Sequence, residues 1–324
     1  MPAIEPPDFA CAAALDVVTA GEAMALFAAQ QAGPLESVDG FQRALAGAEL
    51  NVAIGLARLG LKVGYVSRVG DDSFGRHLQA VLDAEGIDRR HLAMDAQHPT
   101  GFMLKSRNDD GSDPAIEYFR LGSAASHLRV ADYPGDYFAA SRHLHLTGIY
   151  VAVSPSTREF VLRAAQDART AGRSLSFDPN LRPRLWASRA DMVDTLNHLA
   201  SLSDWVLPGL DEGRLLTGHD HPEDIADFYL ARGARVVVVK LGAQGAFHAS
   251  AVGRGRVPGR QVARVIDTVG AGDGFAVGVI SGLLEGLELP EAVARGNAIG
   301  ARVVQFPGDS DGLPTRAQLD ADGA

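Results

Sequence analysis

Between residues 143 and 239 the sequence alternates short apolar runs with longer amphipathic segments, and this rhythm constrains the fold more than any other feature. The apolar runs that we predict as strands are 143–148, 174–177, 205–207 and 236–239. The segments that we predict as helices are 155–171, 189–201, 211–216 and 222–231. The run 236–239 is apolar throughout, which is typical of a strand buried on both faces. Strands that alternate with helices in this way predict an α/β fold with a mostly parallel sheet covered by helices.

The first 122 residues contain two parts that fit such a core less well. A strand over 17–22, a helix ending at Leu59, a strand over 63–70 and a helix capped by 71–73 continue the alternation. The runs 23–29, 100–107 and 115–120 are extended, the last two joined by an acidic turn-forming loop, whereas 33–46 has no regular pattern. We expect the segments near 22–45 and 98–122 to form a small β lid over the carboxyl ends of the strands, where open α/β sheets bind ligands. The prediction is a single domain over 16–324 with these lid segments inserted, and residues 1–15 as an N-terminal tail.

Composition and charge exclude several classes of protein. The formal net charge of −10 over 324 residues argues against nonspecific binding to nucleic acid or to an anionic membrane surface. No apolar run reaches the roughly 18–20 residues that span a bilayer. The single Cys11 excludes a disulfide framework and a cysteine-rich zinc site, and it is compatible with a reducing cytoplasm. We therefore expect a cytoplasmic protein that binds neither nucleic acid nor a membrane.

A glycine-rich stretch near the C-terminus, Asp267–Phe275, indicates a specific chemistry. It follows 260–266, which we predict as a short strand, and it leads into an apolar helix from Phe275. A Gly-x-Gly turn that opens a helix leaves several backbone N–H groups free to bind an anion, above all phosphate. Asp273 fits such a site if it takes the proton from a hydroxyl that attacks the phosphate. The alternative is a simple glycine turn in which Asp273 caps the helix.

Polar clusters follow several of the predicted strands, and their carboxyl ends meet at one edge of a parallel sheet. The clusters are 178–182, 208–212, 240–245 and 267–273. Four clusters at that edge predict a functional site. Because the only lysines are Lys62, Lys105 and Lys240, no P-loop is present, and dinucleotide-binding, serine-hydrolase and zinc-protease motifs are also absent. The pairs His143/His145 and His219/His221 are too sparse for a zinc site.

Two stretches carry a resemblance to a known family. Residues 46–53, with Gly60 and Gly70 at their offsets, resemble the N-terminal signature of the ribokinase-like (PfkB) carbohydrate kinases, and 267–275 resembles the C-terminal signature. The resemblance extends from about Val17 to Leu319. It implies a three-layer α/β/α fold with a mostly parallel central sheet and a small β-sheet lid. It also implies ATP as cosubstrate, Mg²⁺ as metal and a homo-oligomer, and it leaves a requirement for a monovalent cation open.

Within that family the sequence is most similar to kinases of 2-keto-3-deoxygluconate. The segments that carry this similarity are 21–24, 47–51, 117–124, 178–182 and 307–309. The similarity implies transfer of phosphate from ATP to the 6-hydroxyl of 2-keto-3-deoxy-D-gluconate. Two alternatives stay open: a kinase of the same fold for a neutral sugar such as fructose or ribose, and a non-catalytic sugar- or nucleotide-binding protein. Arginine forks would discriminate between a sugar acid and a neutral sugar, because they bind a carboxylate best.

The resemblance also assigns individual residues. The catalytic positions are the base Asp273 and the anion-binding Gly270, Ala271 and Gly272. The substrate positions are Gly47, Asn51, Met103, Tyr118, Arg120, Arg182, Asp273 and Asp309. The nucleotide positions are Asn180, Lys240, Gly242, Gly245, Gly270, Gly272 and Asn297, and the metal position is Glu212.

Two departures from the family pattern and one charged face remain to be interpreted. Gly209 stands where relatives often have Asn, so Asp211 or Asn180 would have to help Glu212 hold the metal. Met103 stands where some relatives have Tyr, which predicts an apolar substrate contact. Lys105 and Arg107 share the strand face of Met103 and are either ligands or solvated lid charges, and we expect Arg107 to be solvated.

Overall fold

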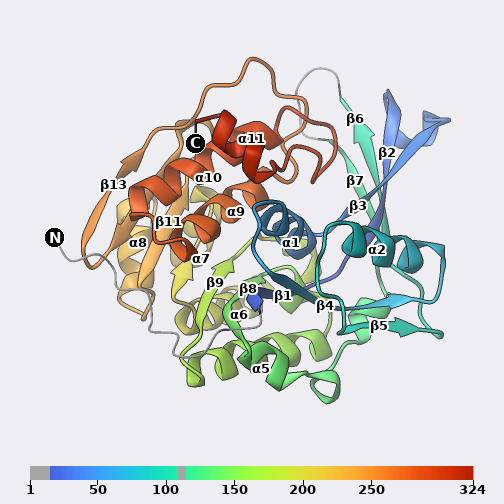
Figure 1. Cartoon of the computed structure of the whole chain (residues 1–324), viewed down its shortest axis with the longest axis horizontal. Helices are drawn as coiled ribbons and strands as arrows, with labels where there is room; N and C mark the ends of the chain where they lie inside the picture. Colours follow the sequence, from blue (N-terminus) through green and yellow to red (C-terminus); the bar gives the residue numbers. More distant parts are fainter. Residues whose placement is uncertain (1–14, 109–113, 324) are drawn as a thin grey trace.

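The computed structural model describes residues 15–108 and 114–323, which form two β-sheets with helices packed around the larger one (Figure 1). The expected N-terminal tail and the tip of the 108–114 loop fall almost entirely outside the described residues. Among the described residues, none of the helices combines the length and the apolar character that crossing a membrane requires.

The larger sheet has nine strands in the part of the chain that the structure describes, in the order β13-β12-β11-β10-β9-β8-β1-β4-β5. The strands are β1 (Leu15–Ala20), β4 (Val63–Gly70), β5 (Leu92–Asp95), β8 (Ser141–Thr147), β9 (Ser174–Asp178), β10 (Trp205–Val206), β11 (Val236–Lys240), β12 (Ala246–Ser250) and β13 (Gly253–Val257). All neighbours from β5 to β11 pair in parallel, whereas β12 and β13 are antiparallel. The predicted mostly parallel sheet is therefore confirmed, and the sequence pattern missed β5, β12 and β13.

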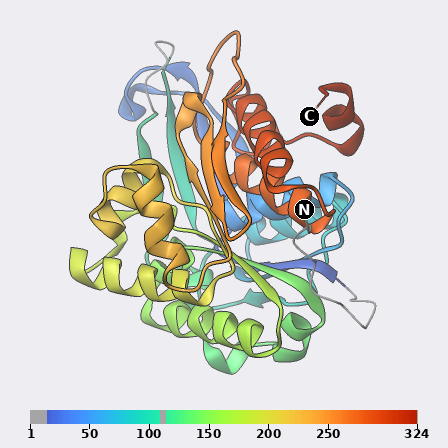
Figure 2. The same ribbon diagram turned by 90° about the vertical axis from the view of Figure 1, so that its left-hand side faces the viewer.

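Helices cover both faces of this sheet, as the alternation predicts (Figure 2). On one face lie α3 (Gly135–Ala139), α4 (Tyr150–Val153), α5 (Pro155–Thr170), α6 (Arg189–Leu202), α7 (Leu210–Thr217) and α8 (Pro222–Leu230). On the other lie α1 (Ala48–Arg58), α2 (Ser73–Ala84), α9 (Ala271–Leu284) and α10 (Leu289–Val303), with α11 (Arg316–Ala321) after them. Alternate residues of β11 enter the two cores, since Val237 packs on one side and Val238 on the other. This arrangement is the three-layer α/β/α fold.

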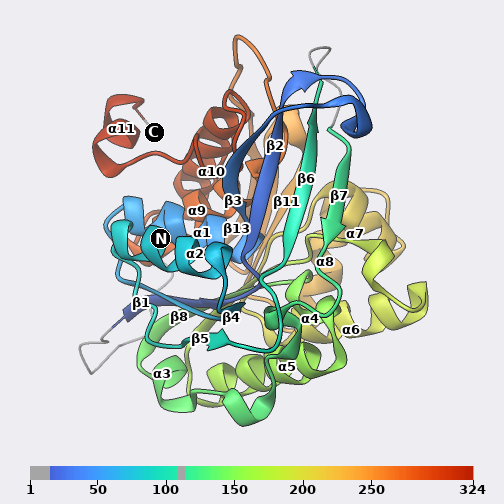
Figure 3. The same cartoon turned by 90° about the vertical axis from the view of Figure 1, so that its right-hand side faces the viewer.

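A second, four-stranded sheet stands beside the first, with its strands upright in Figure 3. It consists of β2 (Met24–Ala32), β3 (Phe41–Ala46), β6 (Phe102–Arg107) and β7 (Ile116–Phe119) in the order β3-β2-β6-β7. β6 and β7 form the predicted antiparallel hairpin, and the central pair β2 and β6 is parallel. The expectation that 33–46 is irregular was wrong for Phe41–Ala46, because this segment pairs with β2 along its whole length. The lid therefore draws its strands from both predicted segments.

The predicted strand over 260–266 is also wrong. These residues have no strand hydrogen bonds, and most of their side chains, including Val265 and Ile266, are exposed. Strand propensity did not decide the outcome, because a strand also needs ladder hydrogen bonds to a neighbour, and β13 ends the sheet among the described residues without pairing to this segment. The glycine-rich stretch is instead reached through an extended connection, anchored where the Ile266 amide donates to the carbonyl of Val304 at 2.7 Å.

Candidate active site

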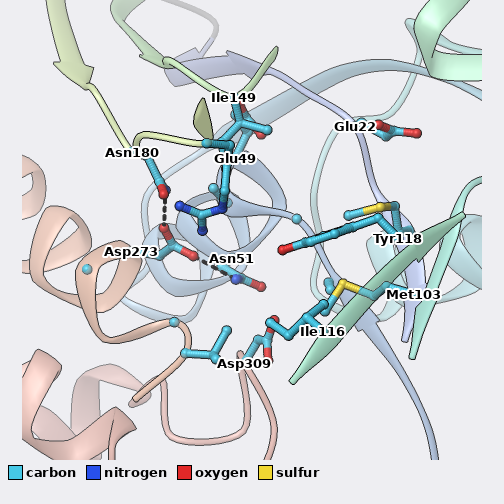
Figure 4. Close-up of a pocket in the computed structure, with 18 of the residues that line it drawn as sticks. Glu22, Glu49, Asn51, Met103, Ile116, Tyr118, Ile149, Asn180, Asp273 and Asp309 are labelled. Carbon is cyan, nitrogen blue, oxygen red and sulfur yellow. Dashed lines mark hydrogen bonds between the residues drawn. The ribbon is translucent and has the colours of Figure 1, made fainter. Parts of the chain in front are cut away.

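Asp273 lies in the first turn of α9, with only 8% of its surface exposed. The helix begins after Gly270, whose φ of +83° and close approach to the Asp309 carbonyl, 2.4 Å from where a Cβ would lie, leave no room for a side chain. Asn51 of α1 donates from Nδ2 to Oδ2 of Asp273 at 2.8 Å, and Asn180 donates from Nδ2 to Oδ1 at 3.4 Å. Figure 4 shows both amides directed at the Asp273 carboxylate from opposite sides. Helix α1 and the segment after β9, which are far apart in sequence, thus orient this carboxylate.

The surroundings of Asp273 make it a base that titrates near neutral pH. Burial raises the pKa of Asp273 to about 7, an effect opposed by the Asn51 hydrogen bond and reinforced by the nearby Asp178 and Asp309 carboxylates. A general base is most effective when its pKa lies close to the working pH. The arrangement therefore suits proton abstraction from a hydroxyl, and not only the capping of a helix.

The start of α9 and Lys240 together form a cradle for an anion. The helix N-terminus directs free backbone N–H groups and the positive end of the helix dipole toward the site. Nζ of Lys240 lies 3.7 Å from where a Cβ on Gly272 would be, and it forms an ion pair with Asp178 Oδ2 at 2.6 Å. Burial alone would lower the pKa of Lys240, but Asp178 and Glu212 outweigh burial and raise it, so the ammonium stays protonated.

A pocket of about 410 Å³ joins this cradle to the small sheet. All eight predicted substrate residues line it: Gly47, Asn51, Met103, Tyr118, Arg120, Arg182, Asp273 and Asp309. The cradle side adds Asn180, Glu212, Lys240, Gly270 and Gly272. Figure 4 shows Met103, Ile116 and Tyr118 of the lid across the pocket from Asp273. The carboxyl ends of the core strands and the lid therefore enclose one common space, as the sequence predicts.

The two arginines that were expected to bind a carboxylate differ in their surroundings. Arg120 is buried and pairs with Glu22, with Nε donating to Oε2 at 2.7 Å and Nη2 at 2.5 Å from the same oxygen. Ser123 donates to the other Glu22 oxygen at 2.5 Å. Arg182 is only partly buried and donates from Nη1 to the Leu181 carbonyl at 2.9 Å. Among the described side chains, no carboxylate pairs with Arg182, so its charge is the one available to a ligand.

Glu212 contacts backbone amides with both carboxylate oxygens. Oε1 accepts from the Leu181 amide at 2.7 Å, and Oε2 accepts from the Gly209 amide at 2.6 Å. Asp211 does not compensate for the glycine at 209, since its side chain is 92% exposed, pairs with Arg214 and does not line the pocket. Within 15–108 and 114–323, no group of three or more His, Cys, Asp or Glu side chains could hold a metal. A metal in this site would therefore depend mainly on oxygens that a ligand brings.

Three of the predicted nucleotide residues and Ala271 do not line this pocket. Gly242 begins a single 3-10 turn after β11, Gly242–Gln244, and Gly245 follows it; both glycines have positive φ. Asn297 of α10 donates from Nδ2 to the carbonyls of Val257 and Pro258 at 3.2 and 3.1 Å. Their assignment to a nucleotide remains a prediction. The paired His143 and His145 are buried in β8 against serine hydroxyls, which confirms that they share one strand face.

Sequence reasoning missed several residues of the site. Glu22, Glu49, Ile116 and Ile149 line the pocket, and only the first two lie in segments that carry the family resemblance. Lys105 is not a solvated lid charge: it is 2% exposed and pairs with two carboxylates of the core. The sequence offered one signal for it, because Lys105 alternates with the pocket residue Met103. Arg107 is exposed, as expected, and donates to the Gln30 carbonyl.

Comparison with known proteins places this geometry in a family. The profile of the pfkB family carbohydrate kinases matches residues 14–316. The 2-dehydro-3-deoxygluconokinase of Bacillus subtilis (strain 168) is 53% identical over 306 residues, which cover 94% of each chain. The crystal structure of a PfkB protein from Polaromonas sp. JS666 superposes with a TM-score of 0.88 at 55% identity, over 95% of this chain and 100% of that one. A putative ribokinase II from E. coli, solved with ATP and Mg²⁺, has a TM-score of 0.88 at 27% identity, over 95% and 98% of the chains. The chain described here belongs to the pfkB family of carbohydrate kinases.

Proposed function

We propose that this protein is a 2-keto-3-deoxygluconate kinase that transfers the γ-phosphoryl group of ATP to the 6-hydroxyl of the sugar acid. The observation that carries the reaction type is the buried carboxylate of Asp273 at the mouth of the α9 cradle, with its pKa raised to about 7. The choice of substrate is supported by the similarity to the Bacillus subtilis enzyme and by Arg182 in the same pocket.

The residues of the site divide the work of phosphoryl transfer between them. Asp273 accepts the proton of the attacking 6-hydroxyl, and Asn51 holds its carboxylate in place for that role. The amides of Gly270 and Gly272, which both line the pocket, donate to the oxygens of the transferred group, and Lys240 offsets their negative charge. ATP supplies the phosphoryl group, and Mg²⁺ on its phosphates would neutralise part of their charge. Such a metal keeps several waters and few protein ligands, which fits a Glu212 whose two oxygens already accept backbone amides.

Arg182 is the residue that we expect to bind the sugar carboxylate. It lines the pocket, and no described carboxylate neutralises it. Arg120 also lines the pocket, but Glu22 already balances its charge, so it contributes hydrogen bonds more than net charge. Tyr118 and Met103 of the lid would cover the sugar from the other side.

A substrate panel tests the proposal directly. The purified protein is assayed for ATP-dependent phosphorylation of 2-keto-3-deoxygluconate, its galactonate epimer, fructose and ribose, with the phosphorylated position read by NMR. We expect kcat/KM for the two sugar acids to exceed that for the neutral sugars by about a hundredfold, since one arginine–carboxylate pair is worth roughly 1.5–3 kcal/mol. Equal rates on fructose would favour a neutral-sugar kinase. The variant Asp273→Asn should keep ATP binding and lose turnover by several orders of magnitude, and near-normal turnover would exclude Asp273 as the base.

We propose further that the enzyme works in the cytoplasm as a homo-oligomer. The outer strands of the lid sheet, β3 and β7, are free to pair, and Phe119 and Leu121 at the end of β7 are exposed apolar side chains. Light scattering of the purified protein measures its molar mass in solution. A monomer at micromolar concentration would contradict the proposed homo-oligomer.

A further inference from the structure

Lys105 links the lid to the segment that carries the anion cradle. It extends from β6, and its Nζ lies 2.6 Å from Asp267 Oδ2, 2.7 Å from Asp309 Oδ1 and 3.1 Å from the carbonyl oxygen of Pro307. All three charged side chains are less than a tenth exposed. Figure 4 shows Ile116, the cross-strand partner of Lys105, next to Asp309 at the wall of the pocket. A buried ammonium with three oxygen partners is thus placed between the two sheets.

The two carboxylates that bind Lys105 belong to residues whose other contacts shape the turn at the start of α9. Asp267 Oδ1 accepts from the Val269 amide at 3.0 Å, which shapes the turn just before Gly270. The backbone carbonyl of Asp309 lies directly against Gly270, the residue at which α9 begins. A cation that binds both carboxylates therefore keeps the segment of Asp267 and the segment of Asp309 in a fixed position relative to each other.

The charge of this cluster would be unfavourable without the lysine. Asp267 and Asp309 are two carboxylates on the segments beside a site that must receive the phosphates of ATP, and Asp311 adds a further negative charge near Asp309. Burial alone would lower the pKa of Lys105, but the two carboxylates outweigh burial and raise it, so the ammonium remains charged. Lys105 therefore halves the negative charge of this pair, of which Asp309 lines the pocket.

We propose that Lys105 is a positioning residue for the kinase reaction: as an internal cation it offsets half of the negative charge of Asp267 and Asp309 and fixes the phosphate-binding turn against the lid. The role in turnover rests on the proposed function, whereas the effect on ATP binding does not require a particular sugar. Three oxygen donors around one ammonium also form a set that a small free cation can bind once the lysine is removed.

The test is direct calorimetric binding of ATP with Mg²⁺, in the absence of any sugar, to Lys105→Met and to the matched control Lys62→Met. Lys62 is exposed, and the same substitution there removes a lysine far from any carboxylate pair of the core. Removing the Lys105 ammonium leaves both carboxylates uncompensated on the segments beside the cradle. The repulsion from one extra negative charge, at an effective dielectric of about 20, should raise the Kd for ATP by roughly tenfold or more. The control should remain within about twofold of the wild type. A Kd in folded Lys105→Met within twofold of the wild type would overturn the proposal, as would equal weakening in both variants.

Two further variants separate charge from folding. Lys105→Met/Asp267→Asn removes one carboxylate together with the ammonium, so it should fold without an unbalanced pair and should recover most of the ATP affinity. In Lys105→Ala, added ammonium, methylammonium or K⁺ should restore ATP binding in a saturable manner, while the wild type should not respond. A double variant as weak as Lys105→Met, together with no recovery by any cation, would show that Lys105 acts only through packing. A protein that binds ATP as expected but phosphorylates no sugar acid would contradict the proposed function and leave the role of Lys105 intact.

Discussion

The hydrogen bond from Asn51 to Asp273 sets the pH at which the proposed base becomes active, and the substitution Asn51→Ala tests this. Asp273 must be ionised to accept a proton, so activity falls as the pH drops below its pKa, which is about 7 in the unliganded protein. The bond from Asn51 Nδ2 is 2.8 Å long and buried, and it favours the ionised form. Removing it therefore raises the pKa of Asp273 and shifts the acidic limb of the pH profile upward.

The size of the shift follows from the strength of such a bond. Hydrogen bonds to charged groups contribute roughly 1.5–3 kcal/mol, and about 1.36 kcal/mol corresponds to one pKa unit. A protonated Asp273 would keep a weaker bond to the same amide, so the expected change is near the lower end, about one pH unit. At a pH one unit below the wild-type midpoint, kcat/KM should thus be about a tenth of its plateau value in the wild type and about a hundredth of its own plateau value in Asn51→Ala.

The assay is kcat/KM for the sugar acid from pH 5 to pH 10, because this parameter reports the pKa values of the free enzyme. The plateau at high pH can also change, since Asn51 lines the pocket and its buried Oδ1 has no hydrogen-bond partner among the described residues. Only the midpoint reports the pKa, and it is independent of a change in the plateau. Asn180→Gly is the matched control: its bond to Asp273 is longer, at 3.4 Å, and glycine tolerates the φ of +39° at this position.

We expect the control to shift the midpoint by less than about half of the shift in Asn51→Ala, since long hydrogen bonds are weak. An unchanged midpoint in Asn51→Ala would refute the assignment of the acidic limb to Asp273. A shift toward lower pH would refute the sign of the argument, because it would mean that Asn51 stabilises the protonated acid.

Three further substitutions test other parts of the site. Gly270→Ala should abolish measurable ATP binding and lower the melting temperature, because its Cβ would collide with the Asp309 carbonyl. Gly286→Ala has a similar φ of +85° but lies in open space, so it should lower only the melting temperature. Equal ATP affinities of the two variants would contradict the predicted collision at Gly270. Arg182→Ala should raise KM for the sugar acid about thirtyfold or more and change KM for ATP by less than about threefold, by the strength of a charged hydrogen bond; equal changes in both would exclude it as the carboxylate ligand. Arg120→Ala should instead reduce the free energy of unfolding by about 3–5 kcal/mol in urea titrations, because it leaves Glu22 buried without its cation, and a stability equal to the wild type would show that the pair is not important for folding.

Local features of the sequence determined the core and the position of the cradle. The apolar run at Val236–Val239 became a buried strand, and the glycine turn before Asp273 became the start of α9, since both depend on neighbouring residues alone. The positive φ at Gly270 and the helical or strand-like spacing of apolar residues are properties of a short segment of chain. For that reason the fold class and the place of the proposed base, Asp273, could be predicted without any coordinates.

Only the tertiary structure decided how charges pair around that carboxylate. Lys105 meets carboxylates 162 and 204 residues away, and Asn51 meets Asp273 across 222 residues. No local pattern distinguishes such a lysine from a solvated one, because its state depends on burial and on the distance to oppositely charged groups. The segment 260–266 is the converse case, since it has strand-forming residues but pairs with no strand among the described residues. The sequence alone thus determined which chemistry the chain can perform, and the packing of distant segments decided which charged groups are available to perform it.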